Sequence, residues 1–131
     1  MSAHASQVRV RYAETDTMGV AYYANYFVWF EVGRSELLRS LGHTYGDLES
    51  AGVMLPVIEA HCQYRDSARY DDEIDIATRG SLLSAVRVAF EYDVTRRADG
   101  IQLAIGRTVH AAVDLNGRPQ RLPKHIQEAL T

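Results

Sequence analysis

The sequence is poor in cysteine, since Cys62 is the only one among 131 residues. No disulfide can therefore form within one chain, which is typical of a protein from a reducing compartment. The chain also lacks any apolar run close to the roughly 20 residues that span a bilayer. Its first residues have neither the basic start nor the apolar run of a signal peptide. We therefore expect a cytoplasmic protein with no membrane partner.

An excess of positive charge is absent as well. With histidine neutral, 14 Lys and Arg against 17 Asp and Glu give a net charge of −3. Proteins that bind nucleic acid are normally basic, so no nucleic-acid partner is expected. The five histidines show neither HxH nor HExxH spacing, and there is no glycine-rich phosphate loop. The sequence thus predicts neither a metal site nor a bound cofactor.

The hydrophobic pattern fits a single domain over residues 1–131. From about Asn25 to Leu41, apolar residues recur at spacings of three and four, which predicts a helix buried on most sides. Gly33 in the middle of this helix indicates close approach to a packed neighbour. Strand-like or extended sequence lies on both sides of the helix, over residues 8–12, 53–64, 74–78, 86–94 and 103–113.

A helix of this kind needs cover, so we expect one mostly antiparallel sheet to curl around it. Two shorter helices are predicted, one opened by a weak capping box at Thr44–Asp47 and one that begins at Pro123. The outer edges of such a sheet are long, and natural proteins seldom leave long edges unpaired. Pairing with a second copy of the chain is the expected remedy.

The most distinctive stretch connects the first strand to the long helix. It places a carboxylate, Asp16, and a flexible Gly19 just before a helix start. The first turn of a helix has unpaired N–H groups and the positive end of the dipole, which suit a developing oxyanion. Asp16 is therefore suited to attack on a carbonyl or to activation of water. On these residues alone, an acid that merely helps the helix to begin is the commoner interpretation.

A longer pattern favours the catalytic interpretation. Its most specific part is Arg11-Tyr12-x-Glu14-Thr15-Asp16-x-x-Gly19-Val20-x-Tyr22-x-x-x-Tyr26. It continues in Phe30-Glu31-x-x-Arg34-x-Glu36-x-Leu38, Ala68-Arg69-Tyr70-Asp71-Asp72-Glu73-Ile74, Gly106-Arg107-Thr108-Val109-His110 and Arg121-Leu122-Pro123. In this order and spacing, the chain resembles the 4-hydroxybenzoyl-CoA thioesterase branch of the hotdog-fold acyl-CoA thioesterases, over roughly Val8 to Ile126.

The resemblance implies an α+β hotdog fold, in which a five-stranded antiparallel sheet wraps around one long central helix. It implies homodimers whose sheets join, often paired into homotetramers, with active sites at the subunit interface. The implied enzyme is an acyl-CoA thioesterase that hydrolyses a CoA thioester to free acid and CoA. The acyl group stays open, as does the choice between CoA and acyl-carrier protein.

The resemblance also implies roles for residues. Asp16 matches the catalytic aspartate and is expected to act as nucleophile or as general base. The helix-start amide of Tyr23 or Ala24 is expected to polarise the thioester carbonyl, and Tyr12 to orient Asp16 or a water molecule. The residues expected to contact substrate are Gly19, Val20, Tyr22, Ala24, Tyr26 and Arg69.

One departure from the family pattern is Tyr23, where many relatives have histidine. Tyrosine has an ordinary pKa near 10, so it cannot be the same proton shuttle at neutral pH.

Two alternatives to a thioesterase remain. A hotdog enoyl-CoA hydratase or dehydratase normally pairs histidine with an acid, which Tyr23 disfavours. A non-catalytic acyl-CoA or acyl-carrier binding module is disfavoured by the intact Asp16 and Gly19.

Overall fold

The computed structural model describes residues 2–131, which form a five-stranded antiparallel sheet with α-helices on it. In chain order the elements are β1 (Ser2–Arg9), the 3-10 turn η1 (Tyr12–Glu14), α1 (Asn25–Ser40), α2 (Tyr45–Ser50), β2 (Val57–Tyr64), β3 (Glu73–Ser84), β4 (Arg87–Arg96), β5 (Gln102–Ala111) and α3 (Lys124–Leu130). Across residues 2–131, every helix falls short of the combined length and hydropathy of a membrane span.

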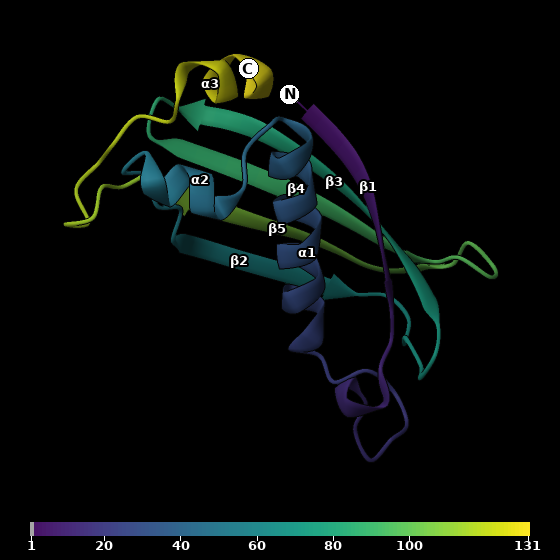
Figure 1. The fold of residues 1–131 in the computed structure, drawn as a ribbon. Helices are drawn as coiled ribbons and strands as arrows, with labels where there is room; N and C mark the ends of the chain where they lie inside the picture. Colours follow the sequence, from purple (N-terminus) through teal and green to yellow (C-terminus); the bar gives the residue numbers. More distant parts are fainter. Residues whose placement is uncertain (1) are drawn as a thin grey trace.

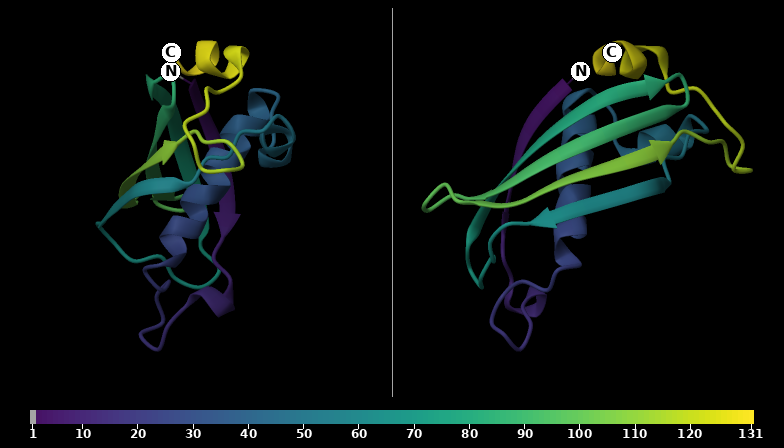
Figure 2. Two further views of the ribbon diagram at one scale, coloured as in Figure 1. Left: turned by 90° about the vertical axis from the view of Figure 1, so that its left-hand side faces the viewer. Right: turned by 180° about the vertical axis from the view of Figure 1, so that it is seen from behind.

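The strands lie in the order β1-β3-β4-β5-β2, so β1 and β2 form the two edges of the sheet. Strands β3, β4 and β5 are sequential neighbours, whereas β2 lies beside β5, with Val57 opposite His110 and Tyr64 opposite Ala104. The sheet is curved, and α1 crosses its concave face (Figures 1 and 2). The chain ends lie close together, and Ser2 Oγ donates to Ala129 O at 2.7 Å.

Helix α1 has the predicted bounds to within one residue, but it is not buried on most sides. The sheet covers the face that carries Trp29, Phe30 and Leu37, while Val28 on another face is 48% exposed. The prediction of one long central helix is therefore only partly right, since α1 has 16 residues and a single chain covers one side of it.

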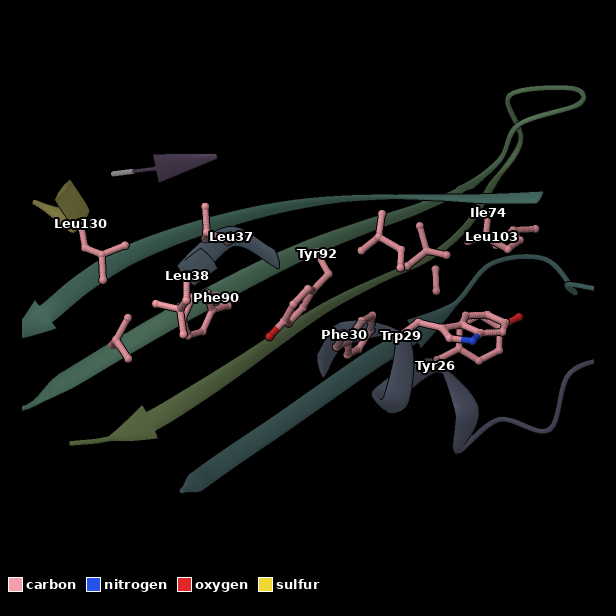
Figure 3. Close-up of a cluster of buried hydrophobic side chains, with 14 of the residues drawn as sticks. Tyr26, Trp29, Phe30, Leu37, Leu38, Ile74, Phe90, Tyr92, Leu103 and Leu130 are labelled. Atoms are coloured by element: carbon pink, nitrogen blue, oxygen red, sulfur yellow. The ribbon is translucent and has the colours of Figure 1, made fainter. Parts of the chain in front are cut away.

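The close approach predicted at Gly33 is confirmed. A Cβ added at Gly33 would overlap Thr78 Oγ1 and lie 3.0 Å from Ile76 Cγ2, both on β3. The buried side chains of α1 continue into a core with the inner face of the sheet (Figure 3). At its centre the ring of Phe30 stacks on Tyr92, with centroids 4.3 Å apart and planes 9° from parallel.

The first strand lies earlier in the chain than predicted. It pairs with β3 from Ser2 to Arg9, so the expected strand over residues 8–12 is wrong beyond Arg9. Beyond that point the chain turns, because Glu14 N donates to Arg11 O at 3.0 Å and the Glu14 carboxylate accepts from Arg11 N at 2.7 Å. Tyr12 therefore lies in a turn and not in the sheet.

Two further boundaries have clear physical causes. The capping box predicted at the start of α2 is present, since Thr44 Oγ1 accepts from Asp47 N at 3.1 Å and Asp47 Oδ2 accepts from Thr44 N at 3.0 Å. The extended segment 53–64 becomes strand β2 only at Val57. Pro56 has no N–H to donate to a ladder, which explains why regular pairing starts after it.

A chain of polar groups crosses the core beneath α1. Tyr92 Oη donates to Thr108 Oγ1 at 2.6 Å, Thr108 Oγ1 donates to His110 Nε2 at 2.9 Å, and His110 Nδ1 donates to Leu55 O at 2.9 Å. When the imidazole of His110 is neutral, each donor in this series of hydrogen bonds has an acceptor. A protonated imidazole would bury a positive charge. Its Nε2 would also become a donor, so the hydroxyl groups of Thr108 and Tyr92 would have to exchange their donor and acceptor roles. Burial accordingly lowers the pKa of His110 from 6.5 to about 4.

Stability is expected to fall on acidification because of His110. Its folded pKa lies below the unfolded value, so the unfolded state binds more protons between these two values. The contribution of neutral His110 to the free energy of unfolding is complete above pH 6.5 and is lost as the pH falls towards about 4. Between pH 7 and pH 4.5 we expect a loss of about 2 kcal/mol in the free energy of unfolding from this residue.

Urea denaturation at the two pH values measures this loss. His110→Gln is expected to reduce the pH dependence by that amount. An equal pH dependence in wild type and His110→Gln would contradict the assignment.

Candidate active site

The residues before α1 form a closed loop around Asp16. Thr15 pairs with Ala21 across the base of the loop, and Asp16 N donates to Val20 O at 2.9 Å. Gly19 N donates back to Asp16 O at 3.0 Å, and Gly19 adopts the left-handed φ of 77° that this turn requires. The loop therefore holds the backbone of Asp16 at a defined place in the connection that leads into α1.

The carboxylate of Asp16 is half-buried and has one anchored oxygen. Oδ1 accepts from Met18 N at 2.9 Å. Within residues 2–131, Oδ2 accepts no hydrogen bond and Asp16 forms no ion pair. The side chain is thus fixed through one oxygen, and the second oxygen is available to accept a proton or to attack an electrophile.

Two backbone amides at the start of α1 are also available. Tyr22 N donates to Glu14 O at 2.8 Å, and Asn25 N donates to Tyr22 O at 2.9 Å. Between them, the amides of Tyr23 and Ala24 have no acceptor in the described part of the chain, and both residues are exposed. They precede the positive end of a 16-residue helix, which favours negative charge on a bound group.

Three tyrosines surround this helix start. The rings of Tyr22 and Tyr23 lie 4.7 Å apart, and Tyr64 from the end of β2 meets Tyr23 edge-on at 6.4 Å. Tyr64 Oη donates to Tyr23 O at 3.0 Å, and burial raises the pKa of Tyr64, which keeps it protonated. The pKa of Tyr22 is raised mainly by its hydrogen bond with Tyr23, and the negative charge of Asp16 acts in the same direction.

Two of the predicted site residues have no hydrogen bond to Asp16 within residues 2–131, although the ring of Tyr26 meets Tyr64 edge-on at 5.0 Å. Tyr26 is 2% exposed, and its hydroxyl accepts from Ala68 N at 3.2 Å, so within one chain it is part of the core. Tyr12 is 78% exposed and meets Tyr70 edge-on at 5.8 Å; no hydrogen bond in residues 2–131 joins its side chain to Asp16. The predicted roles of Tyr12 and Tyr26 towards substrate stay predictions.

Val20 joins the Asp16 loop to the segment that carries Arg69. The two residues form an isolated antiparallel bridge, and Ala21 N donates to Ala68 O at 2.8 Å. Arg96 holds the Arg69 segment from behind, through Nη2 to Ser67 O at 2.6 Å and Nε to Asp72 Oδ2 at 3.1 Å. The exposed guanidinium of Arg69 has no partner in the described chain, so a cation faces solvent next to the loop.

Glu14 has a structural role in the site that the sequence analysis missed. It is 6% exposed, and its carboxylate accepts from Arg11 N at 2.7 Å and from Trp29 Nε1 at 3.3 Å. Its carbonyl oxygen accepts from Tyr22 N at 2.8 Å and from Asn25 Nδ2 at 2.9 Å. Glu14 thereby fixes the Asp16 loop to α1. The available signal was the place of Glu14 in the Arg11–Tyr26 motif, two residues before Asp16.

Comparison with known proteins gives consistent results. The sequence model of the thioesterase-like superfamily matches residues 10–130. A Bacillus subtilis (strain 168) protein with the provisional name acyl-CoA thioesterase YneP is 33% identical over 114 residues, which are 87% of this chain and 82% of that protein.

Two solved structures are closely similar. A hypothetical protein from Aquifex aeolicus superposes with a TM-score of 0.90 at 32% identity, over 98% of this chain and 99% of that one. A DHNA-CoA thioesterase from Staphylococcus aureus superposes with a TM-score of 0.87 at 32% identity, over 93% and 82%.

These similarities confirm a hotdog-like thioesterase fold. They do not single out the 4-hydroxybenzoyl-CoA branch, which stays a prediction. Because the family match spans nearly the whole length and agrees with the fold, the chain belongs to the thioesterase-like superfamily.

Proposed function

We propose that this chain is an acyl-CoA thioesterase, which converts a CoA thioester and water into a free acid and CoA. The observation that carries the proposal is the arrangement at the start of α1. One connection supplies a carboxylate oxygen on Asp16 and two amides, at Tyr23 and Ala24, which have no hydrogen-bond partner within residues 2–131. Thioester cleavage needs both, because negative charge develops on the carbonyl oxygen while the carbon is attacked.

In the proposed mechanism the thioester carbonyl oxygen accepts from the amide of Tyr23 or Ala24. Asp16 then acts in one of two ways. As nucleophile, its Oδ2 attacks the carbonyl carbon, the C–S bond breaks, CoA leaves as thiolate, and water hydrolyses the resulting anhydride. As general base, it takes a proton from water, whose oxygen attacks the same carbon. Both routes end with free acid, CoA and a regenerated carboxylate.

The other predicted residues shape the binding of substrate in this proposal. Gly19 and Val20 hold the loop, and Tyr22 contributes a ring beside the helix start. The free guanidinium of Arg69 suits a phosphate of CoA. Tyr23 contributes its backbone amide to the site. Its side chain can donate a hydrogen bond but does not transfer protons at neutral pH.

We also propose that the enzyme is a homodimer joined through β2, with dimers paired into a tetramer. Strand β2 is an edge, and all its residues except the half-buried Cys62 are exposed in one chain. Val57, Ile58 and Tyr64 are each between 44% and 46% exposed. An edge with this much apolar surface and unpaired backbone is a template for another strand.

The test is release of free thiol from a panel of acyl-CoA esters, covering benzoyl, hydroxyphenylacetyl, short-chain and long-chain groups. We expect catalytic hydrolysis of at least one group. Hydration of an enoyl-CoA without thiol release would show a hydratase instead. Tight binding of CoA esters without any turnover would show a binding module, and either result would refute the proposal.

A further inference from the structure

Helix α1 begins without a side-chain cap. Its N-cap residue is Ala24, and no side chain forms a capping hydrogen bond there. A capping Ser, Thr, Asp or Asn would accept from one of the first amides and so occupy it. The turn that leads into α1 therefore needs a different support, one that leaves the amides of Tyr23 and Ala24 free.

Tyr64 supplies such a support from the end of β2. Its hydroxyl donates to Tyr23 O at 3.0 Å, whereas the helical bond to the same oxygen, from Tyr26 N, is longer at 3.3 Å. A group that donates to a carbonyl oxygen occupies no amide. Burial raises the pKa of Tyr64, so its hydroxyl stays protonated and remains a donor at neutral pH.

The ring of Tyr64 is itself held against the core. It meets Tyr26 edge-on at 5.0 Å and Tyr23 edge-on at 6.4 Å. Tyr26 is a fixed support, because it belongs to the buried cluster (Figure 3) and its hydroxyl accepts from Ala68 N at 3.2 Å. The hydroxyl of Tyr64 therefore reaches Tyr23 O from a defined direction.

This hydrogen bond acts on the peptide group that carries the amide of Ala24. The carbonyl of Tyr23 and the N–H of Ala24 belong to one planar trans peptide group, in which they point in opposite directions. A donor that fixes the direction of the carbonyl therefore also fixes the direction of the N–H. It polarises the peptide group as well, which strengthens the N–H as a donor. The amide of Tyr23 has a separate support, since Tyr22 O accepts from Asn25 N at 2.9 Å.

We propose that Tyr64 is a positioning residue, which aims the Ala24 amide at the thioester carbonyl through the peptide group that follows Tyr23. This inference rests on the proposed function. Negative charge on the carbonyl oxygen is greatest in the transition state, so a well-aimed amide raises kcat more than it tightens the binding of substrate. Tyr64 contacts no reacting atom in this arrangement and acts only through the amide.

Tyr64→Phe tests the role, because it removes the hydroxyl and keeps the ring that meets Tyr23 and Tyr26. Outright removal of one oxyanion donor costs about 10²–10³ in kcat. Tyr64→Phe keeps the donor and loosens its aim, so we expect kcat for thiol release to fall roughly tenfold while KM stays within about twofold.

Amide hydrogen exchange gives a readout that does not depend on activity. The amides of Asn25 and Tyr26 donate to Tyr22 O and Tyr23 O in the same turn. In Tyr64→Phe these two amides are expected to exchange several-fold faster, because a turn that has lost this support opens more often.

The matched control is Tyr45→Phe, which removes a hydroxyl that accepts from Arg34 Nε, also at 3.0 Å, away from the helix start. It is expected to keep wild-type kcat and wild-type exchange at Asn25 and Tyr26, even where it lowers the unfolding temperature. An equal loss of kcat in both variants would show a general effect of stability and would overturn the positioning role.

The remaining outcomes separate this inference from the proposed function. With an active wild type, unchanged exchange in Tyr64→Phe, or faster exchange with unchanged kcat, would refute the positioning role and leave the thioesterase proposal standing. A higher KM with unchanged kcat would place Tyr64 in substrate binding and refute the role as well. A wild type that hydrolysed no acyl-CoA would refute the proposed function, and the catalytic part of this inference with it.

Discussion

Replacement of Asp16 by Asn is expected to lower kcat for thioester hydrolysis by roughly 10²–10⁴-fold, with a much smaller change in KM. The amide of asparagine keeps an oxygen that can accept from Met18 N, so the loop is expected to hold its shape. What disappears is the negative charge and basicity of the second oxygen. Thiol release measured under saturating substrate gives the loss in kcat directly.

The matched control is Asp93→Asn, which removes an exposed carboxylate from β4, where it accepts from Gln102 at 3.1 Å. It is expected to keep wild-type turnover. If Asp16→Asn turned over substrate at the wild-type rate with an unchanged thermal unfolding curve, Asp16 would not be the catalytic carboxylate. Single turnover in heavy-oxygen water identifies the anhydride route if the label appears in Asp16, since water that attacks the Asp16 carbonyl of the anhydride leaves its oxygen there and the general-base route never does.

Gly106→Ala is expected to cost about 3 kcal/mol in the free energy of unfolding. An added Cβ would overlap Phe30 Cζ and Cε2 and would lie 3.0 Å from His61 O. The Phe30 ring cannot move away, because it is 0% exposed and stacked at 4.3 Å on Tyr92. Both the ring and the β2 backbone would have to shift. Chemical denaturation followed by fluorescence of Trp29 measures the change.

Gly46→Ala is the control for this substitution. It lies in α2, where the nearest atom to an added Cβ is Thr44 Oγ1 at 3.6 Å, so we expect no loss and a gain of up to about 1 kcal/mol from helix propensity. Adding Phe30→Leu to Gly106→Ala is expected to recover part of the loss by making room. If Gly106→Ala were as stable as wild type, the proposed overlap would be wrong.

Much of the fold could be predicted because its local signals agree with its tertiary contacts. The period of apolar residues located α1 to within one residue, and alternation located β4 and β5. It located only the first part of β3, because the prediction covers residues 74–78 and the strand runs from Glu73 to Ser84. The start of β1 could not be found this way, since Ser2–Gln7 contains small and polar residues that pair with β3 by backbone bonds. The position of β2 beside β5 is likewise a long-range pairing that no local pattern encodes.

The site was predictable only in its local part. Asp16, Gly19 and the helix start are close in sequence, so their spacing was informative. The burial of Tyr26 depends on Ala68 and Tyr64, which are distant in sequence. The partner of the Tyr12 ring is Tyr70, again from another segment.

The bond from Tyr64 Oη to Tyr23 O ties the last residue of an edge strand to the turn that presents the free amides. A second chain paired along that edge would therefore help to hold the turn in place. In the proposed dimer joined through β2, specific activity is expected to decline on dilution, because separated subunits lose the neighbour along this edge.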